Sequence, residues 1–180
     1  MRFLVLSIDH NWQLAPIPQI TVTPKMAENT TRLEAVLRRV IADRGVDLIC
    51  EESNPCYASV AQMLAYQYSP RIPWRNIVMT AQERLEAGIY EASLDRPFDE
   101  VEIPPDSGNV QTIHHRIPSD DVRERFFANQ SVQGGSEMGV KSILVICGDM
   151  HADFVKHILE ESQFEAEVNH ELISRKDWVA

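Results

Sequence analysis

Three short apolar runs in this chain each end on polar or ionisable residues. The runs cover residues 1–6, 46–50 and 141–147. The residues that follow them are Ser7-Ile8-Asp9-His10, Glu51-Glu52 and Gly148-Asp149-Met150-His151. Short runs that are apolar almost throughout are typical of strands covered on both faces of a sheet. Because the carboxyl ends of parallel strands share one edge, where ligands bind, the pattern predicts a polar site at that edge.

Helical periodicity separates these runs. Thr31 and Glu34 form a capping-box pattern before an amphipathic stretch that Gly45 is placed to end. Further helices are predicted over 58–68, 80–92, from 119 onwards and over 152–161, with short strands over 98–103 and 165–168. The proline-containing residues 11–25 are interpreted as a loop, and Gln133 to Ser136 as a flexible connector. This order predicts a single α/β domain over residues 1–180, with a mainly parallel sheet flanked by helices.

Charge and cysteine content limit the function classes. The 180 residues carry 17 Lys and Arg against 27 Asp and Glu, a formal charge of −10, without a basic cluster. Nucleic acid and an anionic membrane surface are therefore not expected as partners. No apolar stretch approaches the ~20 residues that a membrane span needs, and Asp9 and His10 interrupt the opening run before a signal peptide could form. Cys50, Cys56 and Cys147 contain no CxxC pair, which predicts free thiols and a cytoplasmic location.

His151 is the best candidate for chemistry. Glycine at 148 permits a tight strand-to-helix turn, and a His in the first turn of a helix favours the neutral ring. His10 follows the first strand. Only one of Glu51 and Glu52 is expected to face the same side as the histidines, because adjacent strand residues point to opposite faces. Two His and one carboxylate could hold a divalent metal with an open position for water, or a His–Glu pair could activate water without metal.

The remaining histidines have simpler interpretations. His114-His115-Arg116 fits a half-exposed loop or strand end, and His157 and His170 are interpreted as structural. The sequence has no G-x-S-x-G, no phosphate-binding G-x-x-x-x-G-K-[ST] and no complete H-E-x-x-H. A serine-nucleophile hydrolase is therefore not supported.

The order of these motifs is similar to that of the TraB/TIKI superfamily, whose wider circle includes haem-binding ChaN-like and erythromycin-esterase-like proteins. Gly148-Asp149-Met150-His151 matches the second GxxH motif of that group, and Val46 to Glu51 resembles its strand ending in Glu. Val122 to Ala128 resembles its Arg-bearing helix, with Arg123 in the better matching position and Arg125 as the other choice. The first GxxH motif is degenerate, since Ser7 stands in the place of Gly.

The resemblance implies a hydrolase acting on a small molecule or a peptide. TIKI-like members would be metal-dependent and esterase-like members metal-free. We expect His10, Glu51 and His151 to be catalytic and to bind a divalent metal, with Arg123 as a clamp for a developing oxyanion and Asp9 and Asp149 as orienting groups.

The alternative is a non-enzymatic module that binds a small molecule or a partner chain at the same edge, lined by Trp12 and Trp74. Several small relatives in the superfamily have no enzymatic role, and the degenerate first motif fits this alternative. The sequence leaves the metal identity, the oligomeric state and the role of residues 54–118 open.

Overall fold

The computed structural model describes residues 1–13, 23–90, 98–102, 110–114 and 116–172. Its centre is a five-stranded sheet in which every neighbouring pair of strands is parallel, in the order β3-β2-β6-β1-β7. The strands are β1 (Arg2–Ile8), β2 (Leu48–Glu51), β3 (Trp74–Asn76), β6 (Ser142–Gly148) and β7 (Glu165–Asn169). Strands β4 (Phe98–Glu102) and β5 (Val110–His114) form a separate antiparallel pair. The predicted α/β class with a parallel sheet is confirmed.

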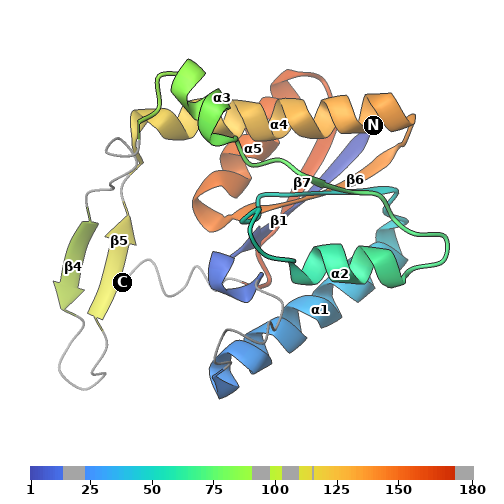
Figure 1. Cartoon of the computed structure of the whole chain (residues 1–180), viewed down its shortest axis with the longest axis horizontal. Coiled ribbons are helices and arrows are strands. Elements are labelled where there is room, and N and C mark those ends of the chain that lie inside the picture. Colours follow the sequence, from blue (N-terminus) through green and yellow to red (C-terminus); the bar gives the residue numbers. More distant parts are fainter. Residues whose placement is uncertain (14–22, 91–97, 103–109, 115, 173–180) are drawn as a thin grey trace.

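Helices cover both faces of the central sheet (Figure 1). The helices are α1 (Pro24–Arg44), α2 (Val60–Gln67), α3 (Ala81–Glu86), α4 (Pro118–Met138) and α5 (Asp149–Glu161), with a short 3-10 turn η1 (His10–Trp12). Buried residues of α1 and α2 pack on one face of the sheet, and buried residues of α4 and α5 pack on the other. The result is a three-layer arrangement in which the sheet is the middle layer.

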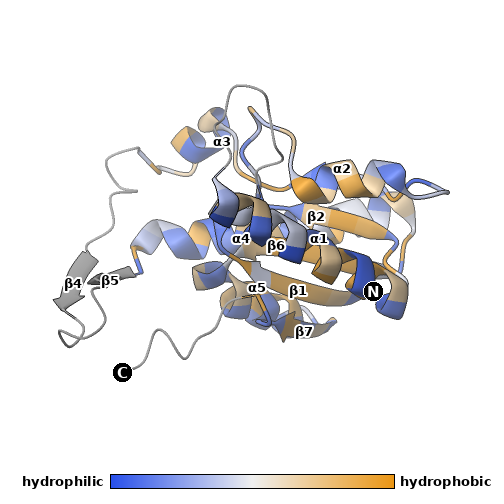
Figure 2. Cartoon of the chain, turned by 90° about the horizontal axis from the view of Figure 1, so that it is seen from below, coloured by the Kyte–Doolittle hydropathy of each residue, from blue (hydrophilic) through white to orange (hydrophobic). Residues whose placement is uncertain are grey.

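Strand alternation decides which residue enters which half of the core. In β1, Leu4 and Leu6 pack toward α1 and α2, whereas Phe3 and Val5 pack toward α4 and α5. Both faces are therefore apolar, as the predominantly orange strands of Figure 2 show. Near the end of β2 the same rule sends Ile49 to the α1 side and Cys50 to the α4 side.

Helix boundaries correct two predictions. Helix α1 begins at Pro24, because Thr23 accepts a hydrogen bond from the main-chain N–H of Met26 and a proline fits the first helical position. The predicted start at Thr31 was therefore too late, and part of the predicted loop is helix. The flexible connector predicted over Gln133 to Ser136 is also wrong, since these residues lie inside α4.

Gly135 explains the second error. A Cβ built on Gly135 would lie 2.6 Å from the sulfur of Met1 and would overlap the side chain of Ile143. The glycine therefore allows α4 to approach β6 closely, and its role is packing rather than flexibility.

The central part of the chain contains a strand that the sequence pattern did not predict. Strand β3 extends the sheet beyond β2 through pairing of Trp74 with Ile49 and of Asn76 with Glu51. The helix predicted over 80–92 is shorter in the structure, because α3 ends at Glu86 and Gly88 has a left-handed φ of 74°. Residues 91–92 and His115 lie outside the described residues. In the described part of the chain, no helix is long and apolar enough to cross a membrane.

Candidate functional site

His10 lies at the carboxyl edge of the sheet, in the 3-10 turn that follows β1. Its Nδ1 is 2.7 Å from Oε1 of Gln13, and its Nε2 is 3.5 Å from Oε2 of Glu52. The His10 side chain is 51% exposed, whereas that of Glu52 is 4% exposed. One nitrogen of the ring therefore faces a protein amide, and the other lies beside a buried carboxylate.

The amide of Gln13 determines which nitrogen of His10 carries a proton. Its Nε2 donates to Oε1 of Glu51 at 3.0 Å and to the main-chain oxygen of Glu52 at 2.8 Å. Because both amide hydrogens are used on acceptors, the Oε1 atom must face the imidazole and accept from it. Nδ1 of His10 thus donates to Gln13, so in the neutral form of the ring the lone pair is on Nε2.

Gly148 gives His10 the space that it occupies. A Cβ built on Gly148 would lie 2.7 Å from Nε2 of His10. Gly148 has φ −57° and ψ 148°, which other residues also adopt, so the requirement is for space and not for backbone freedom. Its N–H donates to Oε2 of Glu52 at 3.0 Å. Gly148 therefore makes room for the ring of His10, although in sequence it belongs to the motif that ends at His151.

Arg123 holds the other oxygen of Glu52. Its Nη2 donates to Oε1 of Glu52 at 2.8 Å, and its Nη1 lies 3.6 Å from Oδ1 of Asp120. The Arg123 side chain is largely buried and its guanidinium lies over the ring of Phe127. Arg123 therefore positions Glu52, and the alternative Arg125 is exposed.

Glu51 faces the side of the sheet opposite to Glu52 and is fully buried. It accepts hydrogen bonds from Ser59 Oγ, from Trp74 Nε1 at 2.7 Å and from Gln13 Nε2. Burial raises the pKa of the Glu51 carboxyl, and the three hydrogen bonds, together with the positive charge that His10 carries when it is protonated, oppose that rise. Glu51 is connected to His10 through Gln13 rather than by direct contact.

His151 belongs to a different set of contacts. As predicted, it lies in the first turn of α5, and it is buried with Nδ1 3.0 Å from Oε1 of Glu124. Arg116 holds both oxygens of Glu124, at 2.6 and 2.9 Å, and its guanidinium stacks 3.5 Å over the ring of Phe154. The acidic neighbours Glu124 and Asp121 raise the pKa of Arg116. The arrangement is a His–Glu–Arg chain in which His151 and Glu124 are buried between α4 and α5 and Arg116 is partly exposed.

The structure therefore separates the three predicted metal ligands. His10 contacts Gln13 and Glu52, Glu51 binds three donors of its own, and His151 binds Glu124. Among the residues that the structure describes, no three His, Cys, Asp or Glu side chains are grouped to hold a metal ion. The carboxylate beside His10 is that of Glu52.

Ser7, which replaces the glycine of the first motif, is buried and donates to Oδ1 of Asp149 at 2.6 Å. His170 lies on the same carboxylate, with Nδ1 at 3.5 Å from Oδ1. The serine hydroxyl thus faces a carboxylate and not an imidazole, so this group is no nucleophile–base pair. Asp149 holds Ser7 and His170 together. Asp9, the other predicted orienting residue, is exposed.

Two cavities open beside His10. One has a volume of about 600 Å³ and is lined by His10, Glu52 and the segments 53–55, 76 and 78–81 together with Arg84. The second, of about 240 Å³, lies between His10, Gln13 and the segments 53–54 and 57–59. His10 therefore stands between two concave surfaces at the carboxyl ends of β1 and β2, where parallel sheets bind ligands.

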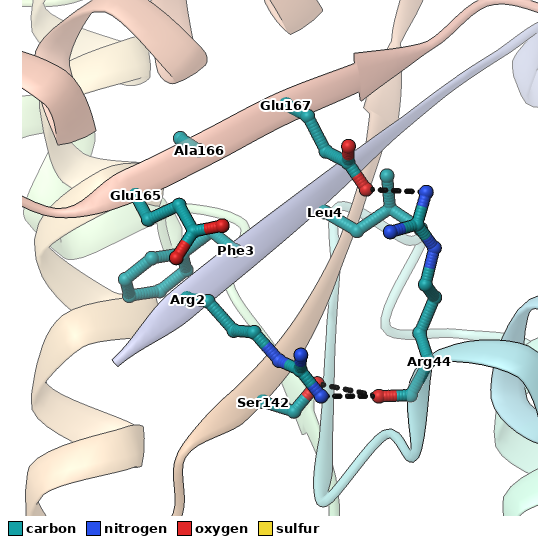
Figure 3. A pocket seen from close by; sticks show the side chains of 8 residues that line it. All are labelled: Arg2, Phe3, Leu4, Arg44, Ser142, Glu165, Ala166 and Glu167. Atoms are coloured by element: carbon teal, nitrogen blue, oxygen red, sulfur yellow. Dashed lines mark hydrogen bonds and ion pairs between the residues drawn. The ribbon is translucent and has the colours of Figure 1, made fainter.

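A further cavity, of about 230 Å³, lies at the amino ends of β1, β6 and β7 (Figure 3). Two of its arginines are already engaged: Arg44 forms an ion pair with Glu167 at 2.9 Å, and Arg2 donates to the main-chain oxygen of Arg44 at 2.8 Å. This cavity contains no histidine among the described lining residues. The edge beside His10 is therefore the better candidate site.

A scan against protein-family models and searches of curated proteins and of solved structures found no match to this chain. The resemblance to the TraB/TIKI superfamily thus stays a prediction.

Three residues of this site carried no clear sequence signal. Gln13 lies at the start of a segment interpreted as a loop, and Arg84 lies in a region where the pattern was weakest. Glu52 was considered beside Glu51, and alternation alone could not decide which of the two would face His10. The turn after β1, which brings Nε2 of His10 to 3.5 Å from Oε2 of Glu52, made that choice.

Proposed function

We propose that the chain is a hydrolase in which His10 is the general base that activates water. The single observation that carries this proposal is the position of His10, with Nδ1 fixed by Gln13 and Nε2 beside Glu52 at the mouth of a cavity of about 600 Å³. A positioned imidazole with a free Nε2 lone pair is the commonest general base in enzymes. The substrate is a small ester or peptide that this cavity can hold.

The proton balance follows from this geometry. Nε2 of His10 takes a proton from water while the water oxygen attacks the carbonyl carbon of the substrate. The imidazolium that forms lies 3.5 Å from Oε2 of Glu52, so the carboxylate stabilises the new positive charge. Nε2 then returns the proton to the leaving alkoxide or amine, which restores the neutral ring.

Glu52 and Arg123 have positioning roles in this proposal. The carboxylate is held at both oxygens, by Arg123 Nη2 and by the main-chain N–H of Gly148, so it cannot rotate away from His10 without losing a hydrogen bond. Arg123 thus acts through Glu52 rather than as the oxyanion clamp expected from the resemblance.

The metal-dependent form of the hypothesis, with His10, Glu51 and His151 as ligands of a divalent metal, stays a prediction. The contacts of these side chains do not bring them together, so no step above passes through a metal. A cytoplasmic location also stays a prediction, and the three free cysteines are consistent with it.

The test uses p-nitrophenyl acetate and the purified chain. We expect His10→Ala to lower kcat/KM by a factor of about 10² to 10⁴, the usual contribution of a general base. His157→Ala is the matched control, because His157 is 68% exposed on the outer side of α5. Equal rates for the two variants would overturn the proposal, since the hydrolysis would then come from surface imidazoles.

Metal analysis distinguishes the two forms of the mechanism. In the metal-free form, treatment with a chelator leaves kcat/KM unchanged, and mass spectrometry finds no stoichiometric metal. A bound metal that is lost in both His10→Ala and His151→Ala would instead establish the metal-dependent form.

A further inference from the structure

The cavity beside His10 contains a cation without an acidic partner. Arg84, from α3, lines the cavity of about 600 Å³ and is half-buried. Its Nη1 donates to the main-chain oxygen of Met79 at 3.2 Å, and within the described part of the chain it contacts no carboxylate. By contrast, ion pairs with carboxylates are formed by Arg75, Arg116 and Arg123.

The other charged groups of the cavity wall do not neutralise Arg84. The carboxylate of Glu52 already accepts hydrogen bonds from Arg123 and from the N–H of Gly148. Glu83, the sequence neighbour of Arg84, does not line the cavity, and its carboxylate closes the capping box of α3 by accepting from the main-chain N–H of Thr80 at 2.7 Å. Among the described residues, the positive charge of Arg84 therefore has no acidic partner at the wall, although the whole chain has a formal charge of −10.

The wall also offers an unused polar group and an apolar surface. Ser53 lines the cavity and is 5% exposed, yet its hydroxyl has no hydrogen-bond partner among the described residues. A buried hydroxyl without a partner is uncommon, because burial removes its bonds to water. The apolar residues that line the cavity are Pro55, Val78, Met79 and Ala81.

We propose that Arg84 binds a carboxylate of the substrate, so that the hydrolase acts on acyl compounds that carry an anionic group beyond a short apolar segment. The apolar wall accommodates that segment, and the hydroxyl of Ser53 donates a hydrogen bond to a polar atom of the bound molecule. A single guanidinium matches the single charge and the planar fork of a carboxylate. This inference deepens the proposed function and rests on it for the reaction, but the anion-binding part can be measured separately.

Binding of a dicarboxylate is measured first, in the His10→Ala background, where the proposed general base is absent. The probe is glutarate, titrated into His10→Ala and into His10→Ala/Arg84→Gln by isothermal titration calorimetry. We expect the loss of Arg84 to weaken glutarate binding about tenfold to a hundredfold, as for charge-assisted hydrogen bonds in a partly buried site. The matched control is Arg125→Gln, because Arg125 is exposed on α4 and lines no described cavity. Equal affinity with and without Arg84 would overturn the inference.

Hydrolysis is measured second, with the mono-p-nitrophenyl ester of glutarate against p-nitrophenyl acetate. We expect the wild-type chain to prefer the glutarate ester, Arg84→Gln to lower that preference at least tenfold, and Arg125→Gln to leave it unchanged. Binding that depends on Arg84 without hydrolysis that depends on His10 would support the anion site and overturn the proposed reaction. Hydrolysis that depends on His10 without any preference for the glutarate ester would overturn the anion site alone.

Discussion

Replacing Gly148 with alanine tests the geometry of His10 without any knowledge of the substrate. The new Cβ would lie 2.7 Å from Nε2 of His10, whereas ordinary contacts are 3.4 Å or longer. The imidazole must therefore move by about 0.7 Å or rotate away. Since the His10 side chain is 51% exposed, it can move into solvent, and the hydrogen bond to Gln13 is then lost.

The expected change in the free energy of unfolding of Gly148→Ala is the difference between two small contributions. Loss of the hydrogen bond between His10 and Gln13 costs about 0.5–1.5 kcal/mol. Alanine at 148 gains about 0.4–1 kcal/mol, because its φ and ψ are permitted and the unfolded chain has less freedom. In the wild-type background these effects nearly cancel or leave a slight destabilisation. In the His10→Ala background only the gain remains, so Gly148→Ala stabilises by about 0.4–1 kcal/mol.

The assay is a double-mutant cycle measured by urea unfolding, with circular dichroism as the signal. The four proteins are wild type, Gly148→Ala, His10→Ala and the double variant. We expect a coupling free energy of about 1 kcal/mol between the two sites. A coupling within error of zero would refute the reasoning, because Gly148 would then not be reserved for the ring of His10. Wherever hydrolysis is measurable, Gly148→Ala should also lower kcat/KM about a hundredfold, as a displaced base does.

Three further outcomes follow from buried groups elsewhere in the fold. Because the pKa of Glu51 is raised, the native state holds the proton of this carboxyl more tightly than the unfolded chain, and the unfolding free energy should fall as pH rises from 4.5 through the native pKa. Urea unfolding at a series of pH values should show this slope in the wild type but not in Glu51→Gln. Burial raises the pKa of Cys50 to about 12 and also raises the pKa of Cys147, so Ellman's reagent should label Cys56 alone in the native protein and all three thiols after denaturation. Rapid labelling of all three thiols in the native protein would contradict the burial of Cys50 and Cys147. Gly135→Ala should destabilise the chain by about 1–2 kcal/mol despite the better helix propensity of alanine, because the new Cβ has no room against β6. An unchanged midpoint of urea unfolding would show instead that α4 can shift outward.

The prediction of the fold succeeded where one physical signal dominated. The apolar runs before His10, Glu51 and Gly148 could hardly be anything except strands covered on both faces, and their separation by helices requires parallel connections. Errors arose where a residue type has two uses. Gly134 and Gly135 look like a flexible connector in sequence, yet in the structure they are the places where α4 approaches the sheet.

The sequence by itself determined that polar and ionisable groups would gather at the carboxyl edge of the sheet, because strand direction and strand ends are local properties of the chain. Only the tertiary structure decided which groups meet. It paired His10 with Glu52 instead of Glu51, and it used Gly148 for the space of His10. It joined His151 to Glu124 on the neighbouring helix, and it brought Arg84 to the cavity wall. These contacts depend on the turn after β1 and on the packing of α4 against α5, which follow from the whole core and have no short-range signal in the sequence.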